Sequence, residues 1–218
     1  MNALFFSSGH IIQAMDCNMG IFLGECFKVP FLIREFFPGV NLKKYRDVHG
    51  KRYTYLENER DALEASRSAP RGRFLGFREH IFTGRDGTVG ARHANADFTF
   101  GTIYQRSLAT LGARMRYGHP DFLDSFWARY RGGMSKCSPT VNLSEDLFAG
   151  YNVRMREEQS PHYDFLEYEK GREATFNAAS GLFSKVSGGA VAVLRSRDNN
   201  LLCERLGVLN NLSFSSWR

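Results

Sequence analysis

The sequence lacks the features that mark disulfide-rich, zinc-binding and membrane-spanning chains. Its four cysteines are widely spaced and form no Cys-x-x-Cys pair: Cys17, Cys26, Cys137 and Cys203. A disulfide framework or a zinc site is therefore not expected, and a reducing compartment is the default. No apolar run approaches the roughly 18 residues that span a bilayer, and Phe5-Phe6 follows no basic leader. We expect a soluble or peripheral chain without a signal peptide.

Internal repeats and low-complexity segments are also missing from the sequence. At 218 residues, of which 43% are hydrophobic, the chain is long enough for one large domain or two small ones with a buried core. The formal net charge of +6 favours an anionic partner, either a nucleotide phosphate, an acidic lipid or a nucleic acid. Charge alone does not choose among these three.

Hydrophobic periodicity predicts strands that alternate with helices, and hence an α/β sandwich. Strands are predicted over residues 4–16, 74–82, 162–168 and 188–194. Helices are predicted over residues 20–37, 98–115, 120–130, 144–156 and 172–186. Pro30 should break or kink the first helix. The apolar side chains of Leu75, Phe77 and Ile81 should be buried in the second strand.

The segments between these elements are predicted to be polar connections. Residues 38–73 are rich in charged side chains, and we interpret them as a flexible insertion with one short helix. Residues 84–95 contain three glycines and are predicted to form a loop. The asparagine pairs at 199–200 and 210–211 are predicted to form turns.

The segment with the richest chemistry runs from residue 116 to residue 146. It reads Arg-Tyr-Gly-His-Pro-Asp-Phe at 116–122, Gly-Gly-Met-Ser-Lys at 132–136 and Asn-Leu-Ser-Glu-Asp at 142–146. An imidazole, basic side chains, glycine turns and two adjacent carboxylates suit a pocket that holds an anionic substrate and moves a proton.

Glu145 and Asp146 stand at the start of a predicted helix, with Ser144 as its N-cap. Two interpretations of this carboxylate pair stay open. Either the pair complements the helix macrodipole, or it supplies a general base that takes a proton from a substrate hydroxyl.

The basic residues of the same segment also have two interpretations. Arg131, Lys136 and Arg116 either neutralise an anionic substrate, such as one that carries phosphate, or are ordinary surface charges. His119 is pushed to an extended conformation by the proline that follows it. We expect its ring to lock the loop by bonding Asp121 or a backbone carbonyl, rather than to act in acid–base catalysis. Metal binding is not expected, because no ligand spacing joins it to another histidine.

Asp16 ends the first predicted strand, at the position where ligands collect in open α/β sheets. Its carboxylate either holds a divalent ion, a ribose or a donor sugar, or it caps a turn with Asn18. Lys170-Gly171-Arg172 is a weaker candidate, for a phosphate-binding loop. Lys185 falls late in a predicted helix and is expected to be exposed to solvent.

Several segments together resemble one enzyme family. These segments are 12–18 (IQAMDCN), 25–28 (ECFK), 76–84 (GFREHIFTG), 99–109 (TFGTIYQRSLA), 116–122 (RYGHPDF), 142–152 (NLSEDLFAGYN) and 167–173 (EYEKGRE). In this order, over residues 10–186, they resemble the catalytic region of the β-1,3-glucan and callose synthases, glycosyltransferase family 48.

The resemblance implies an incomplete glycosyltransferase domain of the A type, which is Rossmann-like, over residues 1–186, with a divergent tail over 187–218. It also implies transfer of glucose from UDP-glucose to a growing β-1,3-glucan with inversion at the anomeric carbon. By position, Asp16 resembles the donor-site aspartate and Lys185 a lysine near the nucleotide-sugar. Glu145 and Asp146 resemble the acidic pair at the acceptor end, with Asp146 as the base.

The resemblance implies further components of the reaction. Lys136 and Arg131 would bind the donor. No cofactor is certain, and a divalent cation such as Mg²⁺ is compatible with the chemistry. The implied partners are UDP-glucose, a β-1,3-glucan acceptor, the transmembrane parts of a full-length synthase and, as for some fungal members, a regulatory small GTPase. Such a synthase is a multi-pass protein whose catalytic region lies on the cytosolic face of the plasma membrane.

Departures from the family pattern leave a second interpretation open. Met19-Gly20-Ile21-Phe22 stands where the family has Q-D-N-Y, and no Glu-Gln pair follows Lys185. We therefore expect a synthase fragment with little or no activity in isolation. The alternative is a non-catalytic relic or binding module that keeps the fold and a weak affinity for UDP-sugars. Nucleic-acid binding is suggested by charge alone and is not expected, because the arginines are scattered along the chain.

Overall fold

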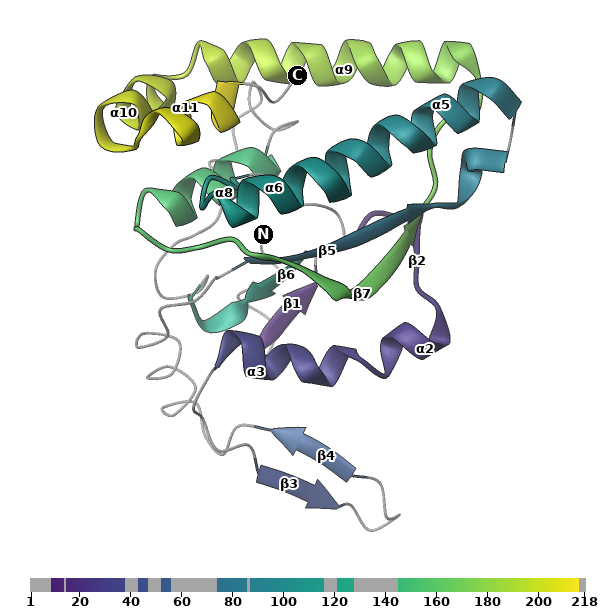
Figure 1. Cartoon of the computed structure of the whole chain (residues 1–218), viewed down its shortest axis with the longest axis vertical. Helices are drawn as coiled ribbons and strands as arrows, with labels where there is room; N and C mark the ends of the chain where they lie inside the picture. The colour runs from purple at the N-terminus through teal and green to yellow at the C-terminus, as the bar shows by residue number, and fades with distance from the viewer. Residues whose placement is uncertain are drawn as a thin grey trace.

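The computed structural model describes residues 9–13, 15–37, 43–46, 52–55, 74–85, 87–115, 121–127 and 145–215. Within these ranges a five-stranded mixed sheet carries a short helical segment on one face and a larger layer of helices on the other (Figure 1). The α/β class predicted from the sequence is confirmed.

Two parallel strands form the centre of the sheet. β5 (Phe74–Ile81) pairs in parallel with β7 (His162–Lys170), and their last residues lie opposite each other. Antiparallel pairing adds β1 (Ile11–Gln13), β6 (Phe122–Asp124) and β2 (Met19–Gly20), in the order β1-β6-β5-β7-β2. The burial of β5 is almost continuous, as expected for a strand that is covered on both faces.

The first face of the sheet is covered by α2 (Leu23–Cys26), η1 (Val29–Phe31) and α3 (Leu32–Phe36) (Figure 1). Pro30 lies in the first turn of η1, where its missing N–H leaves no hydrogen bond unmade. The predicted break of this helix is therefore confirmed. The core on this face comprises Leu32, Phe36, Phe37, Leu75, Phe77, Phe122, Phe126, Leu166 and Tyr168.

A larger helical layer covers the second face (Figure 1). After β5, the short η2 (Phe82–Arg85) leads into α5 (Gly87–Phe98), the π-helical η3 (Thr99–Tyr104) and α6 (Gln105–Thr110). The later helices are α8 (Glu145–Arg154), α9 (Phe176–Leu194), α10 (Arg197–Arg205) and α11 (Val208–Ser215). The core on this side comprises Met115, Leu147, Phe148, Tyr151, Ala190, Val193, Leu202 and Phe214.

The helical layer is held to the sheet by close backbone approach. The backbone N–H of Glu79 on β5 donates to Oγ1 of Thr102 on η3 over 3.1 Å. Gly101 permits this approach, because an added Cβ would stand 2.6 Å from Oε2 of Glu79. These contacts fix η3, and the helices that continue from it, over the central strand.

Residues 38–73 were predicted to be an insertion with one short helix. The described part of this segment is instead a hairpin of β3 (Lys43–Arg46) and β4 (Arg52–Tyr55), with Lys43 opposite Tyr55. The alternation of tyrosine with polar residues, such as Arg52-Tyr53-Thr54-Tyr55, is typical of a strand. The remaining residues of the insertion lie outside the described ranges.

Most of the predicted elements are confirmed, and four predictions are wrong. The strands at 74–82 and 162–168 and the helices at 98–115, 144–156 and 172–186 are present with shifted bounds. The predicted loop at 84–95 is largely α5, and the predicted helix at 120–130 begins with β6. The predicted strand at 188–194 continues α9, and both asparagine pairs lie inside helices.

Tertiary packing explains the errors in the tail. Two consecutive glycines argue against a helix, since each costs about 1 kcal/mol relative to alanine. Val186, Ala190 and Val193 nevertheless recur at helical spacing and pack into the second core cluster. Their burial outweighs the poor propensity of the Gly188-Gly189 step.

Candidate functional site at the carboxyl end of the parallel strands

The carboxyl ends of β5 and β7 form the edge at which a ligand is expected in an α/β sheet. The segment that follows β1 is brought to this edge by Asn18. Its Nδ2 donates to the carbonyl oxygen of Gly171 over 2.7 Å, and the N–H of Gly171 donates to the carbonyl oxygen of Asn18 over 2.9 Å. Asp16 is thereby held beside the end of β7.

Asp16 is paired with a buried lysine at this edge. Nζ of Lys170, the last residue of β7, lies 3.4 Å from Oδ2 of Asp16. The side chain of Lys170 is 1% exposed, whereas that of Asp16 is 46% exposed. The ammonium therefore lies inside the protein, whereas the Asp16 side chain is partly exposed to solvent, three residues after the end of β1.

Arg172 follows Lys170 and is tied to the helical layer. Its backbone N–H donates to Oγ1 of Thr83 over 2.9 Å, and its guanidinium forms an ion pair with Asp97 of α5. Gly171 lies against the ring of Phe82, since an added Cβ would stand 2.7 Å from Cζ. Both cations of the predicted phosphate-binding loop are thus engaged by carboxylates, so this loop presents no free cation to a phosphate.

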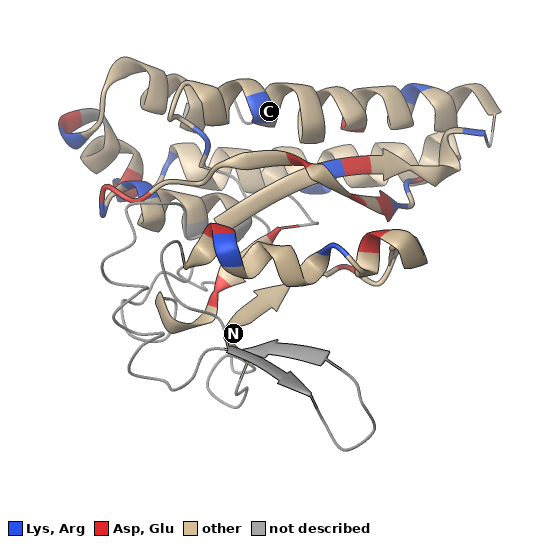
Figure 2. Ribbon diagram, turned by 60° about the horizontal axis from the view of Figure 1, so that its bottom comes forward, with Lys and Arg blue, Asp and Glu red and all other residues tan. Residues whose placement is uncertain are grey.

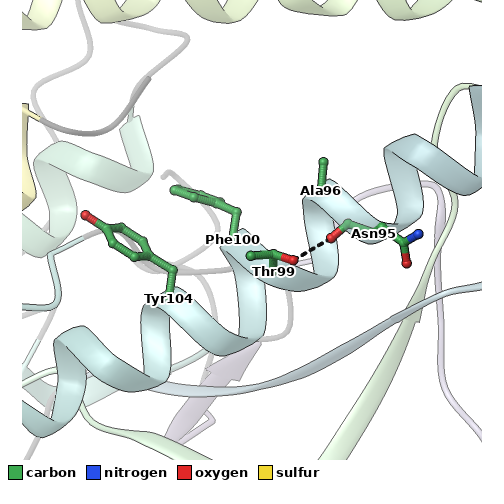
Figure 3. Close-up of a pocket in the computed structure, with 5 residues that line it drawn as sticks. All are labelled: Asn95, Ala96, Thr99, Phe100 and Tyr104. Carbon is green, nitrogen blue, oxygen red and sulfur yellow. Dashed lines mark hydrogen bonds between the residues drawn. The ribbon is translucent and has the colours of Figure 1, made fainter.

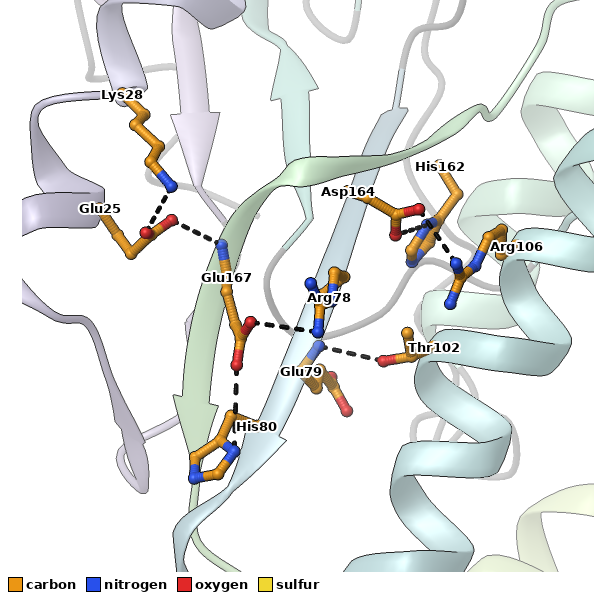
Figure 4. A network of polar contacts seen from close by, with 10 residues as sticks. All are labelled: Glu25, Lys28, Arg78, Glu79, His80, Thr102, Arg106, His162, Asp164 and Glu167. Carbon is orange, nitrogen blue, oxygen red and sulfur yellow. Dashed lines mark hydrogen bonds and ion pairs between the residues drawn. The ribbon is translucent and has the colours of Figure 1, made fainter.

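A network of polar contacts joins α2 to the two central strands (Figure 4). Glu25 accepts hydrogen bonds from Nζ of Lys28 over 2.5 Å and from the backbone N–H of Glu167 over 2.9 Å. The carboxylate of Glu167 in turn pairs with Arg78 at 3.5 Å and lies 3.9 Å from His80. Burial favours a raised pKa for Glu25, but the hydrogen bonds outweigh burial and the pKa is lowered.

His162, at the start of β7, is a buried and neutral imidazole. Burial lowers its pKa to about 3, and the positive charges of Arg114 and Arg106 lower it further. Arg106 is also paired with Asp164, with Nη1 3.1 Å from Oδ2 (Figure 4). His162 therefore does not serve as a proton donor at neutral pH.

Asp121 forms a buried ion pair with Arg114. Nη2 of Arg114 lies 3.0 Å from Oδ1 and 2.7 Å from Oδ2 of Asp121, and both side chains are almost completely buried. Nη1 of Arg114 donates to Oγ of Ser160 over 2.7 Å. This buried ion pair fixes the position of the chain directly after residues 116–120. His119, the other residue predicted to structure this loop, lies outside the described residues.

Glu145 and Asp146 are the first two residues of α8, as predicted, although their side chains lie outside what the structure describes. The helix packs into the core through Leu147 and Phe148, which are buried. At Gly150 it lies directly against the backbone of Met115, since an added Cβ would stand 1.0 Å from the carbonyl oxygen of Met115. The start of α8 is therefore fixed against the segment that precedes residue 116.

The predicted donor-binding cations are not gathered around Asp16 in the described part of the chain. Lys185 is exposed on α9, as predicted, and α9 belongs to the helical layer rather than to the edge of the sheet (Figure 1). Lys136 and Arg131 lie outside the described residues. Along the described elements, Lys and Arg residues are interspersed with Asp and Glu residues (Figure 2).

An open depression of about 560 Å³ lies on the helical layer, over the end of α5 and over η3 (Figure 3). It is lined by Asn95, Ala96, Thr99, Phe100 and Tyr104. The rings of Phe100 and Tyr104 stack with centroids 5.8 Å apart, and Oγ1 of Thr99 donates to the carbonyl oxygen of Asn95. None of these five described residues carries a charge.

Two observations bear on metal and membrane binding. In the described ranges no three side chains of His, Cys, Asp or Glu gather in a way that could hold a metal ion. Of the helices that the structure describes, none is long and apolar enough to cross a membrane.

The sequence does not identify Lys170 as the partner of Asp16. It predicts Lys170 only as part of a phosphate-binding loop, whereas in the structure its buried ammonium lies 3.4 Å from the carboxylate of Asp16. The signal in the sequence is a lysine at the end of a strand with alternating burial, at Leu166, Tyr168 and Lys170. This alternation places the lysine on the buried side of the strand.

The fold and this edge define an α/β protein with a solvent-facing carboxylate at the end of its parallel strands. The profile of the family described as 1,3-beta-glucan synthase component matches residues 1–216. The chain belongs to this family. The match continues through residues 187–216, beyond the point at which the resemblance was expected to end.

Curated relatives agree with the family match. Callose synthase 12 and callose synthase 7 of Arabidopsis thaliana are 34% and 35% identical to the chain over 98% of its length. The 1,3-beta-glucan synthase component FKS3 of Saccharomyces cerevisiae is 32% identical, also over 98% of the chain. The matched regions cover 10%, 10% and 11% of these proteins, so the chain spans about a tenth of their length.

Proposed function

We propose that this chain is part of the catalytic region of a 1,3-β-glucan synthase, which transfers glucose from UDP-glucose to a growing β-1,3-glucan. The observation that carries the proposal is the family match over residues 1–216. It is supported by the exposed carboxylate of Asp16 at the carboxyl end of the parallel strands. Helices on both faces of a mixed sheet are consistent with a Rossmann-like glycosyltransferase domain of the A type.

The proposed reaction is a single displacement with inversion. Asp146, next to Glu145 at the start of α8, takes the proton from the 3-hydroxyl of the acceptor. The hydroxyl oxygen attacks the anomeric carbon, the bond from that carbon to UDP breaks, and UDP leaves with the electron pair. Asp16 binds the donor. Lys136 and Arg131 are proposed to balance the charge of the leaving diphosphate, whereas Lys185 lies on α9, in the helical layer, and is given no part in this step.

The proposed context is a multi-pass membrane synthase whose catalytic region faces the cytosol. Because the chain spans about a tenth of the length of its relatives, we expect glucan formation to need the rest of such a synthase. A small GTPase is a proposed regulatory partner. A divalent cation such as Mg²⁺ remains compatible with the departure of the diphosphate.

The proposed reaction can be tested by grafting the chain in place of the matching segment of callose synthase 12. Membranes that contain the graft should form β-1,3-glucan from radiolabelled UDP-glucose. Asp146→Asn should lower the rate by about 100-fold or more, because a general base contributes that much. Asp164→Asn is the matched control, since this carboxylate is exposed and paired with Arg106. A graft that is fully active with Asp146→Asn contradicts the assignment of the base.

The second candidate function is a non-catalytic module that binds UDP-sugars. It is favoured by Met19 and Gly20, which stand in place of polar residues of the family pattern and whose backbones form β2 beside β7. A graft that binds UDP-glucose but forms no glucan, in a synthase that is otherwise intact, would support this module.

A further inference from the structure

The helical run formed by α2, η1 and α3 is apolar on both of its sides. Its inner side carries Leu32 and Phe36, which are buried in the core against the sheet. Its outer side carries three large apolar side chains, Leu23, Phe27 and Phe31, which are 75%, 71% and 55% exposed. Because these residues are spaced four apart, they follow one side of the run as a ridge. A helix that faces water carries polar side chains on this side, so the ridge indicates an interaction surface.

The charged side chains of the same run are sorted between its two sides. Glu25 is turned to the sheet, where it accepts a hydrogen bond from the backbone N–H of Glu167, and its side chain is 17% exposed (Figure 4). Lys28, its ion-pair partner, is 43% exposed. Arg34 is exposed and follows the ridge at helical spacing, whereas Glu35 is half-buried. The outer side therefore presents cations beside apolar side chains, which complements a surface that is both anionic and apolar.

The chain that follows this run is strongly basic. The hairpin of β3 and β4 begins seven residues after Phe36, and its eight residues include Lys43, Lys44, Arg46 and Arg52 but no acidic residue. An extended chain covers at most about 3.6 Å per residue, so Lys43 stays within about 25 Å of the end of α3. The hairpin can thus reach the same anionic surface as the ridge.

We propose that the outer face of this run, formed by Leu23, Phe27, Phe31 and Arg34, docks on the anionic surface of a membrane. Leucine and phenylalanine side chains of surface-bound helices lie at the boundary between the headgroups and the acyl chains, and cations beside them bind acidic lipids. Docking by this face turns the first face of the sheet toward the membrane and the helical layer away from it (Figure 1). The inference goes beyond the proposed function, because it needs neither a donor nor an acceptor sugar.

A lipid surface fits this face better than a folded protein does. A stable protein–protein interface buries about 800 Å² on each partner, over roughly 20–30 residues, whereas the ridge is a single row of side chains on one short helical run. A bilayer takes up such a row without a shape-complementary pocket. A nucleic acid would match the cations but has no apolar layer for Leu23 and Phe27.

Co-sedimentation of the full chain with lipid vesicles tests this docking surface. The chain should bind vesicles of phosphatidylcholine and phosphatidylserine, and added salt should weaken the binding. Phe27→Ser should lower the partition coefficient about tenfold, because the burial of one phenylalanine ring is lost. Arg34→Gln should lower it about fivefold on these vesicles but not on phosphatidylcholine alone. Phe176→Ser is the matched control and should bind like the unaltered chain, since Phe176 is 74% exposed but lies on α9 in the helical layer.

Tryptophan fluorescence reports whether the ridge itself enters the membrane. The emission of Phe27→Trp should shift to the blue when acidic vesicles are added, and lipids with brominated acyl chains should quench it. Phe176→Trp should show neither effect. Both substitutions replace one exposed aromatic ring by another, so both proteins should fold, and this measurement stands even if a serine variant does not.

The outcomes that would overturn the inference are distinct from those that bear on the proposed function. The inference is wrong if the unaltered chain does not bind acidic vesicles, or if Phe27→Ser or Phe176→Ser binds them as the other does. It is also wrong if the emission of vesicle-bound Phe27→Trp does not shift. A dimer in sedimentation equilibrium that Phe27→Ser dissociates would instead assign this face to a second copy of the chain. The vesicles contain no sugar, so these results hold whether or not Asp146 is the base of a glucosyl transfer.

Discussion

The guanidinium of Arg114 lies directly over Gly76, the third residue of the central strand β5. An added Cβ on Gly76 would stand 2.3 Å from Nη2 of Arg114. The N–H of Gly76 donates to the carbonyl oxygen of Pro161, which also accepts a hydrogen bond from Nη1 of Arg114. The bare backbone of one glycine thus makes room for a buried arginine that links β5, the start of β7 and Asp121.

Gly76→Ala should destabilise the protein by at least about 2 kcal/mol, because the new methyl group overlaps a buried guanidinium that cannot move to solvent. The measurement is the free energy of unfolding in urea. Gly181→Ala is the control, since an added Cβ on Gly181 of α9 meets nothing within 4 Å. The control should stabilise the protein by about 1 kcal/mol through helix propensity. Equal stability of Gly76→Ala and the unaltered chain contradicts the packing described here.

Asp121→Asn and Arg114→Met should each cost about 3–5 kcal/mol, because each breaks a buried ion pair. The combined variant Arg114→Met/Asp121→Asn removes both charges and should cost less than the sum of the two single changes. Urea unfolding of the four proteins gives the coupling energy as a double-mutant cycle. If the two single effects simply add in the double variant, the ion pair does not have the energetic role inferred from its burial.

The central strands and the helices that flank them could be predicted because their sequences agree with the local rules. Apolar residues are nearly continuous in Phe74–Ile81, as expected for a buried strand. The predicted helix start at Glu145-Asp146 also agrees with the structure. In these elements local propensity and tertiary burial favour the same conformation.

The remaining elements depend on contacts between distant residues. Gly87, Gly90 and Gly84 suggest a loop, yet Gly90 and His93 are buried on one face of α5. The ion pair between Asp16 and Lys170 joins residues that are far apart in sequence, and the chain folds them together through the pairing of β2 with β7 and the hydrogen bonds between Asn18 and Gly171. No local pattern reports such a pairing, so the sequence predicts Asp16 as a site residue but not its partner.

Gly150→Ala should prevent α8 from packing against the backbone of Met115, and it should lower the free energy of unfolding by about 3 kcal/mol or more. The added Cβ would stand 1.0 Å from a backbone carbonyl oxygen, that of Met115, and a backbone atom cannot rotate away as a side chain can. Because α8 begins at Glu145 and Asp146, a graft with this change should also lose glucan formation. Gly188→Ala, where an added Cβ meets nothing within 4 Å, is the control for both measurements. Normal stability and activity of Gly150→Ala would show that α8 is not fixed at this contact.

His162 should make the stability of the protein depend on pH. Its pKa is about 3 in the folded protein, against 6.5 for a histidine in water, because burial and nearby arginines disfavour the charged ring. Between these two values the unfolded chain binds a proton that the folded chain does not, so this group lowers stability as the pH falls. The full contribution is present above about pH 6.5, and it is lost progressively down to about pH 3. From pH 7 to pH 5 the expected loss is about 2 kcal/mol.

His162→Phe should remove this part of the pH dependence, because phenylalanine fills a similar buried volume and does not titrate. The measurement is urea unfolding at pH 7, 6 and 5, for the unaltered chain and for His162→Phe. As the pH falls, His162→Phe should lose about 2 kcal/mol less stability than the unaltered chain. If both proteins show the same slope, His162 is protonated in the folded state, and its burial near Arg114 and Arg106 does not keep the ring neutral.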